Sequence, residues 1–249
     1  MSIILSENEI LTKVNENISL IQRENGLTFG TDAFLLASFV KPQKSGVAVE
    51  LGGGTGIISL LCASREKFSK IYCVEIQEDF AKIISRNASL NELENKVISV
   101  HKDVREIKSS DIGLEVDVVF SNPPYMKVDS GKRNVHDEKF IARHEVCGDI
   151  GDFCAAAKKL LKHGGNFYCV WRPDRLTDLM CAMRENSLEP KDMIFVHANT
   201  KSAPSMVIVK AKKGAASGVT VGEPLFLNLD NDPKTLTERA KKIYEECNF

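Results

Sequence analysis

The sequence predicts an α/β fold built on a seven-stranded, mostly parallel sheet with helices on both faces. Short runs rich in β-branched residues alternate along the chain with longer stretches that suit amphipathic helices. This alternation is typical of parallel strands whose faces are covered by the connecting helices. With 249 residues, of which 43% are hydrophobic and 27% charged, the chain can bury one sizeable core and is predicted to form a single domain, 1–249.

Seven short β-branched runs, each bounded by turn residues, are predicted to be strands. They span 45–54, 70–76, 96–103, 116–122, 166–172, 192–198 and 205–214. Only residues 199–204 separate the last two runs, and this connection is too short for a crossover helix. We therefore expect the last two strands to pair antiparallel, which gives a late antiparallel strand.

The stretches between these runs are predicted to be helices. They span 56–66, 78–91, 149–163 and 174–186, with a final helix in the tail 232–249. The "HGG" sequence, with Gly164 and Gly165, is expected to end the third helix as a C-cap. We expect the catalytic core at 45–211, an N-terminal lead-in at 1–44 and a C-terminal extension at 221–249.

Charge and composition exclude several classes of protein. The net charge of −1 gives no global basic field, so a nucleic-acid partner would be held by a local patch. Seven cysteines without a CxxC pair indicate reduced thiols, and the five histidines show no metal-ligand spacing, so no metal is assigned. There is no bilayer-spanning apolar run and no signal-peptide pattern, so we predict a cytoplasmic protein without a membrane partner. The oligomeric state is left open.

A glycine-rich loop follows the first predicted strand. In "VELGGGTGI", Gly52, Gly54 and Gly56 allow a tight turn and a close approach of the backbone to a ligand. Such a loop can also be a mere strand-to-helix turn, but Glu75 follows it by about 20 residues, where a carboxylate can accept both hydroxyls of a ribose. This spacing favours a nucleotide-like ligand. The acid Glu50, on the strand side, would repel a pyrophosphate and suits a ligand with a cationic end.

With this ExGxGxG pattern, residues 45–210 resemble the class I S-adenosylmethionine methyltransferases, which have a Rossmann-like fold. The resemblance implies that Glu50 and the glycines face the methionine part of S-adenosyl-L-methionine and that Glu75 faces its ribose. It also implies that Asp103 accepts a hydrogen bond from the adenine amine, while Val104 donates its backbone N–H. The alternative for Asp103 is an N-cap of the segment that follows it.

The fourth predicted strand ends in "NPPY", which matches the [DNS]-P-P-[YFW] motif of amino-methyltransferases of this class. An amine conjugated to an aromatic ring or a carbonyl is a poor nucleophile, because its lone pair is delocalised. The side-chain carbonyl of Asn122 and the rigidly directed backbone carbonyl of Pro123 can accept the two amine protons and free the lone pair. Tyr125 offers a flat face to a planar substrate, and Asn122 is also expected to border the cofactor. The alternative is a Pro-Pro strand breaker with a packing tyrosine.

Nearly the whole chain resembles the bacterial tRNA (adenine-N6) methyltransferases that modify valine tRNA beside its anticodon. The matching stretches include "LTFGTDAFLLASFV" (27–40), "IARHEV" (141–146), "WRPDRLTDLM" (171–180), "LEPKDMIFVH" (188–197) and "VGEPLFL" (221–227). The triple glycine departs from this family, in which a residue with a side chain often takes the middle position, and we expect little effect on binding. The resemblance implies methylation of an adenine N6 in tRNA. Because NPPY also occurs in enzymes that methylate a glutamine amide of release factors, that activity is the alternative.

Two further stretches allow two interpretations each. Thr31 or Asp32 in "FGTDAFLLASF" either caps a helix that begins there or lines the cofactor pocket. After NPPY, Lys132, Arg133 and Arg143 lie in a polar segment typical of a substrate loop. They are candidates for contacts with tRNA phosphates, and solvated surface charge is the alternative.

Overall fold

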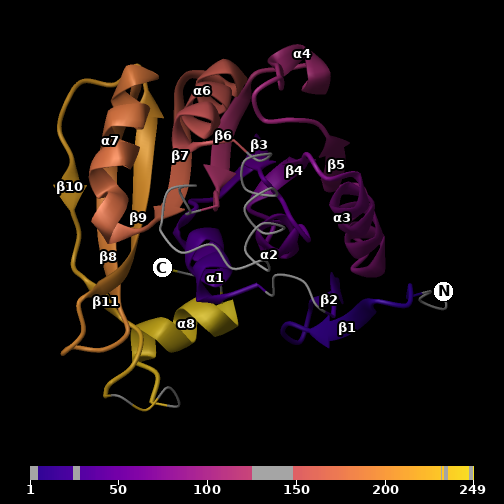
Figure 1. The fold of residues 1–249 in the computed structure, drawn as a ribbon, viewed down its shortest axis with the longest axis horizontal. Coiled ribbons are helices and arrows are strands. Elements are labelled where there is room, and N and C mark those ends of the chain that lie inside the picture. The colour runs from indigo at the N-terminus through magenta and orange to yellow at the C-terminus, as the bar shows by residue number, and fades with distance from the viewer. Residues whose placement is uncertain (1–4, 25–28, 125–147, 231, 233–234, 247–248) are drawn as a thin grey trace, which may run out of the picture.

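The computed structural model describes residues 5–24, 29–124, 148–230, 232, 235–246 and 249, and a large sheet forms its centre (Figure 1). The seven long strands that the sequence predicts are all present. They are β3 (Gln43–Leu51), β4 (Phe68–Glu75), β5 (Val97–His101), β6 (Val116–Ser121), β7 (Leu161–Trp171), β8 (Leu188–His197) and β9 (Pro204–Lys213).

The long strands follow the order β8-β9-β7-β6-β3-β4-β5 across the sheet. From β7 to β5 all neighbours are parallel, whereas β9 is antiparallel to both β7 and β8. The mostly parallel sheet with a late antiparallel strand is thus confirmed. Two further strands of two residues each, β10 (Thr220–Val221) and β11 (Leu225–Phe226), pair with β8. The sequence does not predict them, because two residues are too few to show a period.

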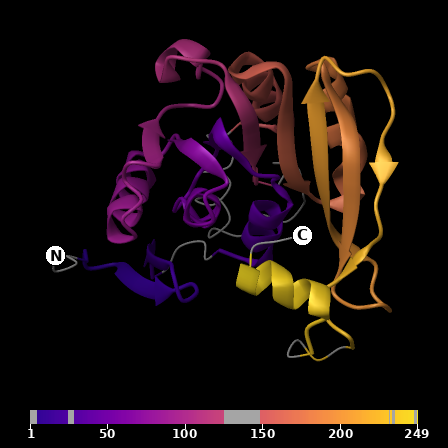
Figure 2. The ribbon, with the colours of Figure 1, turned by 180° about the vertical axis from the view of Figure 1, so that it is seen from behind.

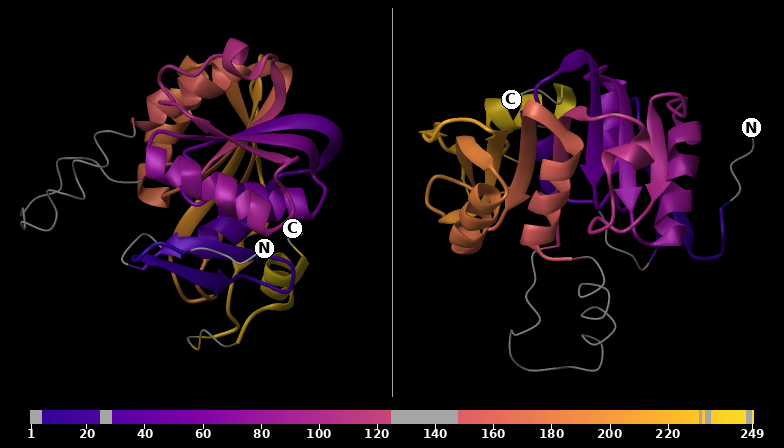
Figure 3. Two further views of the ribbon diagram at one scale, coloured as in Figure 1. Left: turned by 90° about the vertical axis from the view of Figure 1, so that its right-hand side faces the viewer. Right: turned by 90° about the horizontal axis from the view of Figure 1, so that it is seen from above.

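Helices cover both faces of the sheet (Figure 3). The longer ones are α1 (Thr31–Phe39), α2 (Ile57–Ser64), α3 (Glu78–Leu90), α6 (Ile150–Leu160), α7 (Leu176–Glu185) and α8 (Glu238–Glu246), and the short ones are α4 (Ser109–Ile112) and the 3-10 turn η1 (Pro173–Arg175). One buried apolar cluster lies between the sheet and α1, α2, α3 and α8, and a second lies between the sheet and α6 and α7. Within the described ranges, no helix is long and apolar enough to cross a membrane.

A hairpin of β1 (Glu9–Lys13) and β2 (Ser19–Arg23) precedes the core and packs beside α3 (Figure 2). The buried Asn87 of α3 holds it, because its side chain accepts a hydrogen bond from the Ile21 N–H at 2.7 Å and donates to the Ile21 carbonyl at 3.0 Å. Asn91, one turn later, exchanges the same pair of bonds with Ser19. The amides of one helix thus extend a strand edge that would otherwise lack partners.

The helix C-cap expected at Gly164 and Gly165 is wrong. Helix α6 already ends at Leu160, and β7 begins at the next residue. The glycines lie instead in an irregular part of β7, where the register with β6 shifts and Gly164 adopts a φ of +78°. A left-handed φ is as typical of a β-bulge as of a helix cap, so the glycine pair does not distinguish the two.

Candidate functional site

The carboxyl ends of the parallel strands β6, β3, β4 and β5 lie side by side at one edge of the sheet. Leu51, the last residue of β3, pairs with Val74 of β4 on one side and with Ser121 of β6 on the other. The Ser121 hydroxyl also donates to the Leu51 carbonyl at 2.7 Å. The chain runs from β3 to β4 and β5 in one direction and to β6 and β7 in the other, so the strand order reverses here. Ligands of open α/β sheets bind beyond the carboxyl ends of the strands at such a point.

The glycine loop, residues 52–56, folds back over the end of β4. The N–H groups of Gly52 and Gly53 both donate to the Val74 carbonyl, at 2.9 and 3.0 Å. Gly52, Gly54 and Gly56 have φ values of +73°, +54° and +82°, which residues with a Cβ rarely adopt. A Cβ atom at Gly54 would meet no other atom within 4 Å. The backbone of the loop therefore adjoins open space at Gly54.

Glu75 supports this loop from the end of β4. Its Oε2 accepts the Gly54 N–H and its Oε1 accepts the Gln77 N–H, both at 2.9 Å. The residue is only 5% exposed, and this burial raises the pKa of its carboxyl group. A nearly buried carboxylate at the edge of a ligand site suits hydroxyl donors, because they stabilise its charged form.

Glu50 points into the protein beneath the loop. It is 1% exposed, and its Oε2 accepts hydrogen bonds from the Ser59 N–H at 2.9 Å, from the Ser59 hydroxyl and from the Cys73 thiol at 3.4 Å. Ser59 belongs to the first turn of α2, whose N–H groups lack partners within the helix. Burial raises the pKa of Glu50 to about 7. The carboxyl group thus caps α2 and fixes the end of the glycine loop.

Asp103 follows β5 and begins a turn. Its carboxylate accepts the Arg105 N–H at 2.8 Å and forms an ion pair with the Arg105 guanidinium. The hydrogen bond from this guanidinium lowers the pKa of Asp103. Val104, between the two, is 4% exposed. The bond from the Arg105 N–H is a local side-chain-to-backbone bond of the kind expected if Asp103 caps the segment that follows it. The contact of Asp103 with an adenine amine stays a prediction.

Asn122 and Pro123 directly follow β6, with Pro123 buried and Asn122 half-buried. The Nδ2 atom of Asn122 donates to Oδ2 of Asp32 at 2.7 Å. Asp32 lies in the first turn of α1, 90 residues earlier in the chain. Its Oδ1 accepts the Ala33 N–H at 3.0 Å. One carboxylate therefore binds the first turn of its own helix and also holds the amide of the NPPY motif, which the sequence did not predict.

The other predicted site residues lie outside the described residues. They are Tyr125, Lys132, Arg133 and Arg143, all within 125–147. Among the residues that the structure does describe, there is no group of three or more His, Cys, Asp or Glu side chains placed to hold a metal ion.

The described residues of this edge fit S-adenosylmethionine. The positive φ values of the glycine loop and the open space at Gly54 allow a ligand to lie against the backbone. The Glu75 carboxylate accepts the N–H of the same Gly54 and is an acceptor of the kind that ribose hydroxyls require. This edge offers hydrogen-bond acceptors and backbone groups. These are the partners that an uncharged ribose and adenine require.

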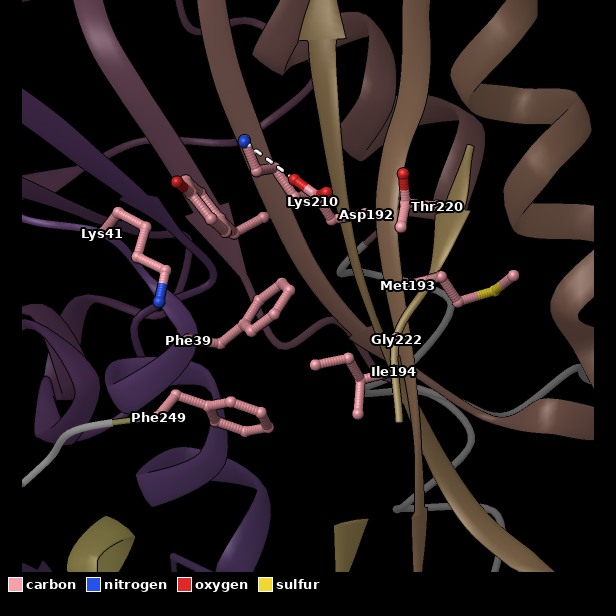
Figure 4. Close-up of a pocket in the computed structure, with 10 residues that line it drawn as sticks. Phe39, Lys41, Asp192, Met193, Ile194, Lys210, Thr220, Gly222 and Phe249 are labelled. Atoms are coloured by element: carbon pink, nitrogen blue, oxygen red, sulfur yellow. Dashed lines mark hydrogen bonds and ion pairs between the residues drawn. The ribbon is translucent and has the colours of Figure 1, made fainter. Parts of the chain in front are cut away.

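A separate pocket of about 250 Å³ lies beside Phe39 (Figure 4). Phe39 is the last residue of α1, whereas Asp32 lies in its first turn. The pocket is also bordered by Tyr168 of β7, and by Asp192 and Lys210, which pair with each other at 2.8 Å. The Phe249 ring also lines it, with its centroid 5.3 Å from that of Phe39. Asp192 and Lys210 already neutralise each other, and Phe249 of the chain itself borders the pocket. No ligand is therefore assigned to this pocket.

Two solved structures of similar fold are described as methyltransferases. A predicted O-methyltransferase from Agrobacterium tumefaciens has a TM-score of 0.69 at 19% identity, over 86% of this chain and 95% of that chain. The tRNA m1G37 methyltransferase of M. jannaschii has a TM-score of 0.57 at 19% identity, over 84% of this chain and 58% of that chain. At such identities the likeness concerns the fold alone, and it confirms the class I methyltransferase fold.

Several curated relatives carry the same name. The tRNA1(Val) (adenine(37)-N6)-methyltransferase of Dyadobacter fermentans is 28% identical over 58% of this chain and 58% of its own length. Proteins of that name from Parabacteroides distasonis and from a Flavobacteriaceae bacterium are 26% and 22% identical, over 73% and 90% of this chain and 75% and 89% of their own lengths. These relatives confirm the resemblance to bacterial tRNA (adenine-N6) methyltransferases.

A family model described as "Methyltransferase small domain" matches residues 24–185. The match covers more than half of the chain and includes the glycine loop, Glu75, Asn122 and Asp32. Membership of a methyltransferase family implies the use of S-adenosylmethionine. The chain belongs to the methyltransferase small domain family.

Proposed function

We propose that this protein uses S-adenosylmethionine to methylate the exocyclic N6 amine of an adenine in tRNA, in the anticodon loop of a valine tRNA. The observation that carries the proposal is the position of Asn122 and Pro123 directly after β6, next to the strand that leads into the glycine loop. Two carbonyl acceptors beside a cofactor loop are what a conjugated amine needs. The names of the curated relatives support adenine in tRNA as the substrate.

The predicted cofactor residues have distinct roles in this proposal. The glycine loop faces the methionine part, and Glu75 accepts from the ribose hydroxyls. Asp103 and the backbone N–H of Val104 bind the adenine edge. Glu50 acts through the loop, because its bonds to Ser59 and Cys73 leave it 1% exposed. Its charged form also adds a negative field near the cationic end of the ligand.

Asn122 and Pro123 prepare the amine for the transfer. Their two carbonyl oxygens accept its two protons, which draws the nitrogen toward a tetrahedral geometry and frees its lone pair. S-adenosylmethionine, held by the glycine loop and Glu75, would supply the methyl group, with the electron pair of the broken S–C bond remaining on sulfur and the amine lone pair forming the N–C bond. The methylated amine then loses one proton to solvent. Because no strong base is needed, rate enhancement comes chiefly from positioning.

The residues after Pro124 complete the substrate site in this proposal. Tyr125 stacks on the adenine, a contact of about 1 to 3 kcal/mol for a base on an aromatic ring. Lys132, Arg133 and Arg143 contact phosphates. An anticodon-loop adenine is already unpaired, so moving it into the pocket costs less than extruding a base from a duplex.

A transfer assay with radiolabelled S-adenosylmethionine tests the proposal. One reaction contains total tRNA, another a release-factor peptide with the acceptor glutamine, and both are repeated with Asn122→Ala. We expect label in tRNA, recovered as N6-methyladenosine, and a loss of turnover by orders of magnitude in the variant. The assay is then repeated with a valine tRNA transcript and with the same transcript in which the adenine beside the anticodon is changed to guanine. Loss of label in the changed transcript locates the site.

Each other result would replace part of the proposal. Label in the peptide alone would assign the protein to the glutamine methyltransferases. Label in tRNA on another nucleoside would remove the N6 amine as the acceptor. A normal rate in Asn122→Ala would remove the amine-orienting role of that residue.

A further inference from the structure

We propose that Asp32 is a positioning residue that fixes the side-chain amide of Asn122, so that the amide presents its oxygen and not its nitrogen to the substrate amine. The inference rests on the proposed function, because it concerns the amine that Asn122 orients. It adds a residue from the segment before the core to the site.

The contact between the two side chains is direct. Oδ2 of Asp32 accepts from Nδ2 of Asn122 at 2.7 Å, and Oδ1 of Asp32 accepts the Ala33 N–H at 3.0 Å. The two carboxylate oxygens thus have different partners: one is tied to the backbone of α1 and the other to Asn122. The orientation of the carboxylate is set by its own helix.

A carboxylate partner decides which end of the amide faces it. An ionised carboxylate only accepts hydrogen bonds, whereas an amide has a donor end and an acceptor end. Nδ2 of Asn122 must therefore face Asp32, and Oδ1 faces away. The terminal torsion of an asparagine has two broad, nearly equivalent wells, so the bond to Asp32 favours one of two orientations that the torsion itself would allow. In the flipped orientation Nδ2 would meet the amine protons, donor against donor.

Asp32 is itself held by its surroundings. It lies in the first turn of α1, where the helix dipole stabilises a negative charge. The hydroxyl of Tyr244 in α8 donates to Oγ1 of the preceding residue, Thr31, at 3.0 Å. A Cβ atom at Gly30 would lie 2.8 Å from Oδ1 of Asp32, although the φ of Gly30, −111°, suits any residue. The absence of a side chain at Gly30 therefore leaves room for the Asp32 carboxylate.

A double-mutant cycle separates positioning from other roles. Asp32→Ala is made in the wild type and in Asn122→Ala, and kcat for tRNA and the Kd for S-adenosylmethionine are measured in all four proteins. We expect Asp32→Ala to lower kcat about 10- to 100-fold in the wild type, by analogy with the loss seen when a partner that orients a metal ligand is removed. In the Asn122→Ala background we expect less than a twofold further loss (about 0.4 kcal/mol at 25 °C), and Asp32→Ala should leave the Kd unchanged in both backgrounds.

Other outcomes of the cycle overturn the inference. An equal loss of kcat in both backgrounds would mean that Asp32 acts independently of Asn122. A weaker Kd with an unchanged kcat would make Asp32 a residue of the cofactor pocket. Asp79→Ala is the matched control, because Asp79 also lies in the first turn of a helix and pairs at the surface with Arg23.

Two further variants test the geometry without removing the side chain. Gly30→Ala places a Cβ against Oδ1 of Asp32, so kcat should fall while the charge is kept. In the exchange Asp32→Asn with Asn122→Asp, the donor and the acceptor swap places, and an aspartate presents an acceptor oxygen whichever way it turns. The exchanged protein should be more active than Asn122→Asp alone, in which two carboxylates face each other. If the exchange restores nothing, the contact does not position the residue.

A measurement without substrate keeps this inference distinct from the proposed function. The side-chain NH₂ resonances of Asn122 are identified in ¹⁵N spectra by their loss in Asn122→Ala. In the wild type we expect one of the two hydrogens to be shifted and protected, and Asp32→Ala should abolish both effects. If the wild type fails to methylate tRNA, the proposed function falls, but these spectra still decide the contact. An unchanged pair of resonances in Asp32→Ala would overturn the inference itself.

Discussion

The sulfur of Cys73 occupies the space that a side chain at Gly53 would need. An ideal Cβ at Gly53 would lie 2.2 Å from Sγ of Cys73 and 3.2 Å from Cδ1 of Ile84. Unlike its neighbours in the loop, Gly53 has no positive φ, so its need for glycine is steric and not conformational. The middle glycine of the triple and the buried thiol of β4 are therefore matched to each other.

Gly53→Ala should destabilise the protein by about 1 to 3 kcal/mol, as overpacking in a close-packed core does. Cys73→Ala removes the opposing sulfur, so the double variant should be more stable than the sum of the two single changes predicts. Urea unfolding of the four proteins measures this coupling. Strict additivity would show that the loop moves away from β4 instead of clashing with it.

Glu50→Gln should change how stability depends on pH. The folded pKa of Glu50, about 7, is above its ordinary value of 4.5, so the folded protein holds a proton that the unfolded chain releases between these two values. Stability attributable to this group is therefore lost as pH rises from 4.5 to 7, by about 3 kcal/mol in all. Glutamine does not titrate, so the difference between variant and wild type should change across this window and be flat above it.

Denaturant unfolding between pH 4.5 and 8 provides the measurement for Glu50. Glu78→Gln is a suitable control, because it removes an exposed carboxylate that pairs only with Lys82 at the surface in the described contacts. Curves of wild type and Glu50→Gln that run parallel over the whole range would contradict a raised pKa for Glu50.

Glu75→Gln should weaken the binding of S-adenosylmethionine. Hydrogen bonds to a charged acceptor contribute about 1.5 to 3 kcal/mol, so we expect a Kd raised roughly 10- to 100-fold. Isothermal titration calorimetry with S-adenosylmethionine measures it, and kcat at saturating cofactor should fall far less. An unchanged Kd would remove Glu75 from the ribose site and leave it only the support of Gly54.

Lys67→Met should destabilise the protein at the far end of α1. Lys67 is 4% exposed, and its Nζ donates to the carbonyl oxygens of Ala37 at 2.7 Å and Val40 at 2.9 Å. Methionine would fill the space but remove the ammonium donor from these carbonyls and leave Ala37 only the weak thiol donor Cys62, at a cost of about 3 kcal/mol. Chemical unfolding tests this, with the exposed Lys41→Met as control. Equal stabilities of the two variants would show that water replaces the ammonium.

Joint replacement of Lys132 and Arg133 by alanine should reduce the salt dependence of tRNA binding. Each phosphate contact releases counterions, so two contacts contribute roughly 1.5 to the slope of log K against log salt. Filter binding at several salt concentrations gives this slope. Lys158→Ala with Lys159→Ala removes two exposed lysines from the last turn of α6 and should leave it unchanged. The same slope in both double variants would return Lys132 and Arg133 to ordinary surface.

The sequence by itself determined the seven long strands and the residues at their carboxyl ends. The seven strands were predictable, because alternating β-branched runs and flanking turn residues are local signals. The glycine loop, Glu75 and the "NPP" step were predictable as members of one edge, since the carboxyl ends of parallel strands meet there. The glycines at 164 and 165 were misassigned because a left-handed φ is a local property that caps and bulges share.

Only the tertiary structure decided which side chains meet. Asp32 and Asn122 are 90 residues apart, and no local pattern brings α1 to the end of β6. Glu50 received partners inside the protein because the packing of α2 on β3 and β4 encloses it. The packing of the loop on β4 also places Cys73 against Gly53, so that no side chain fits at Gly53. Local sequence fixes backbone direction and periodicity, whereas contacts between distant side chains depend on how the helices pack on the sheet.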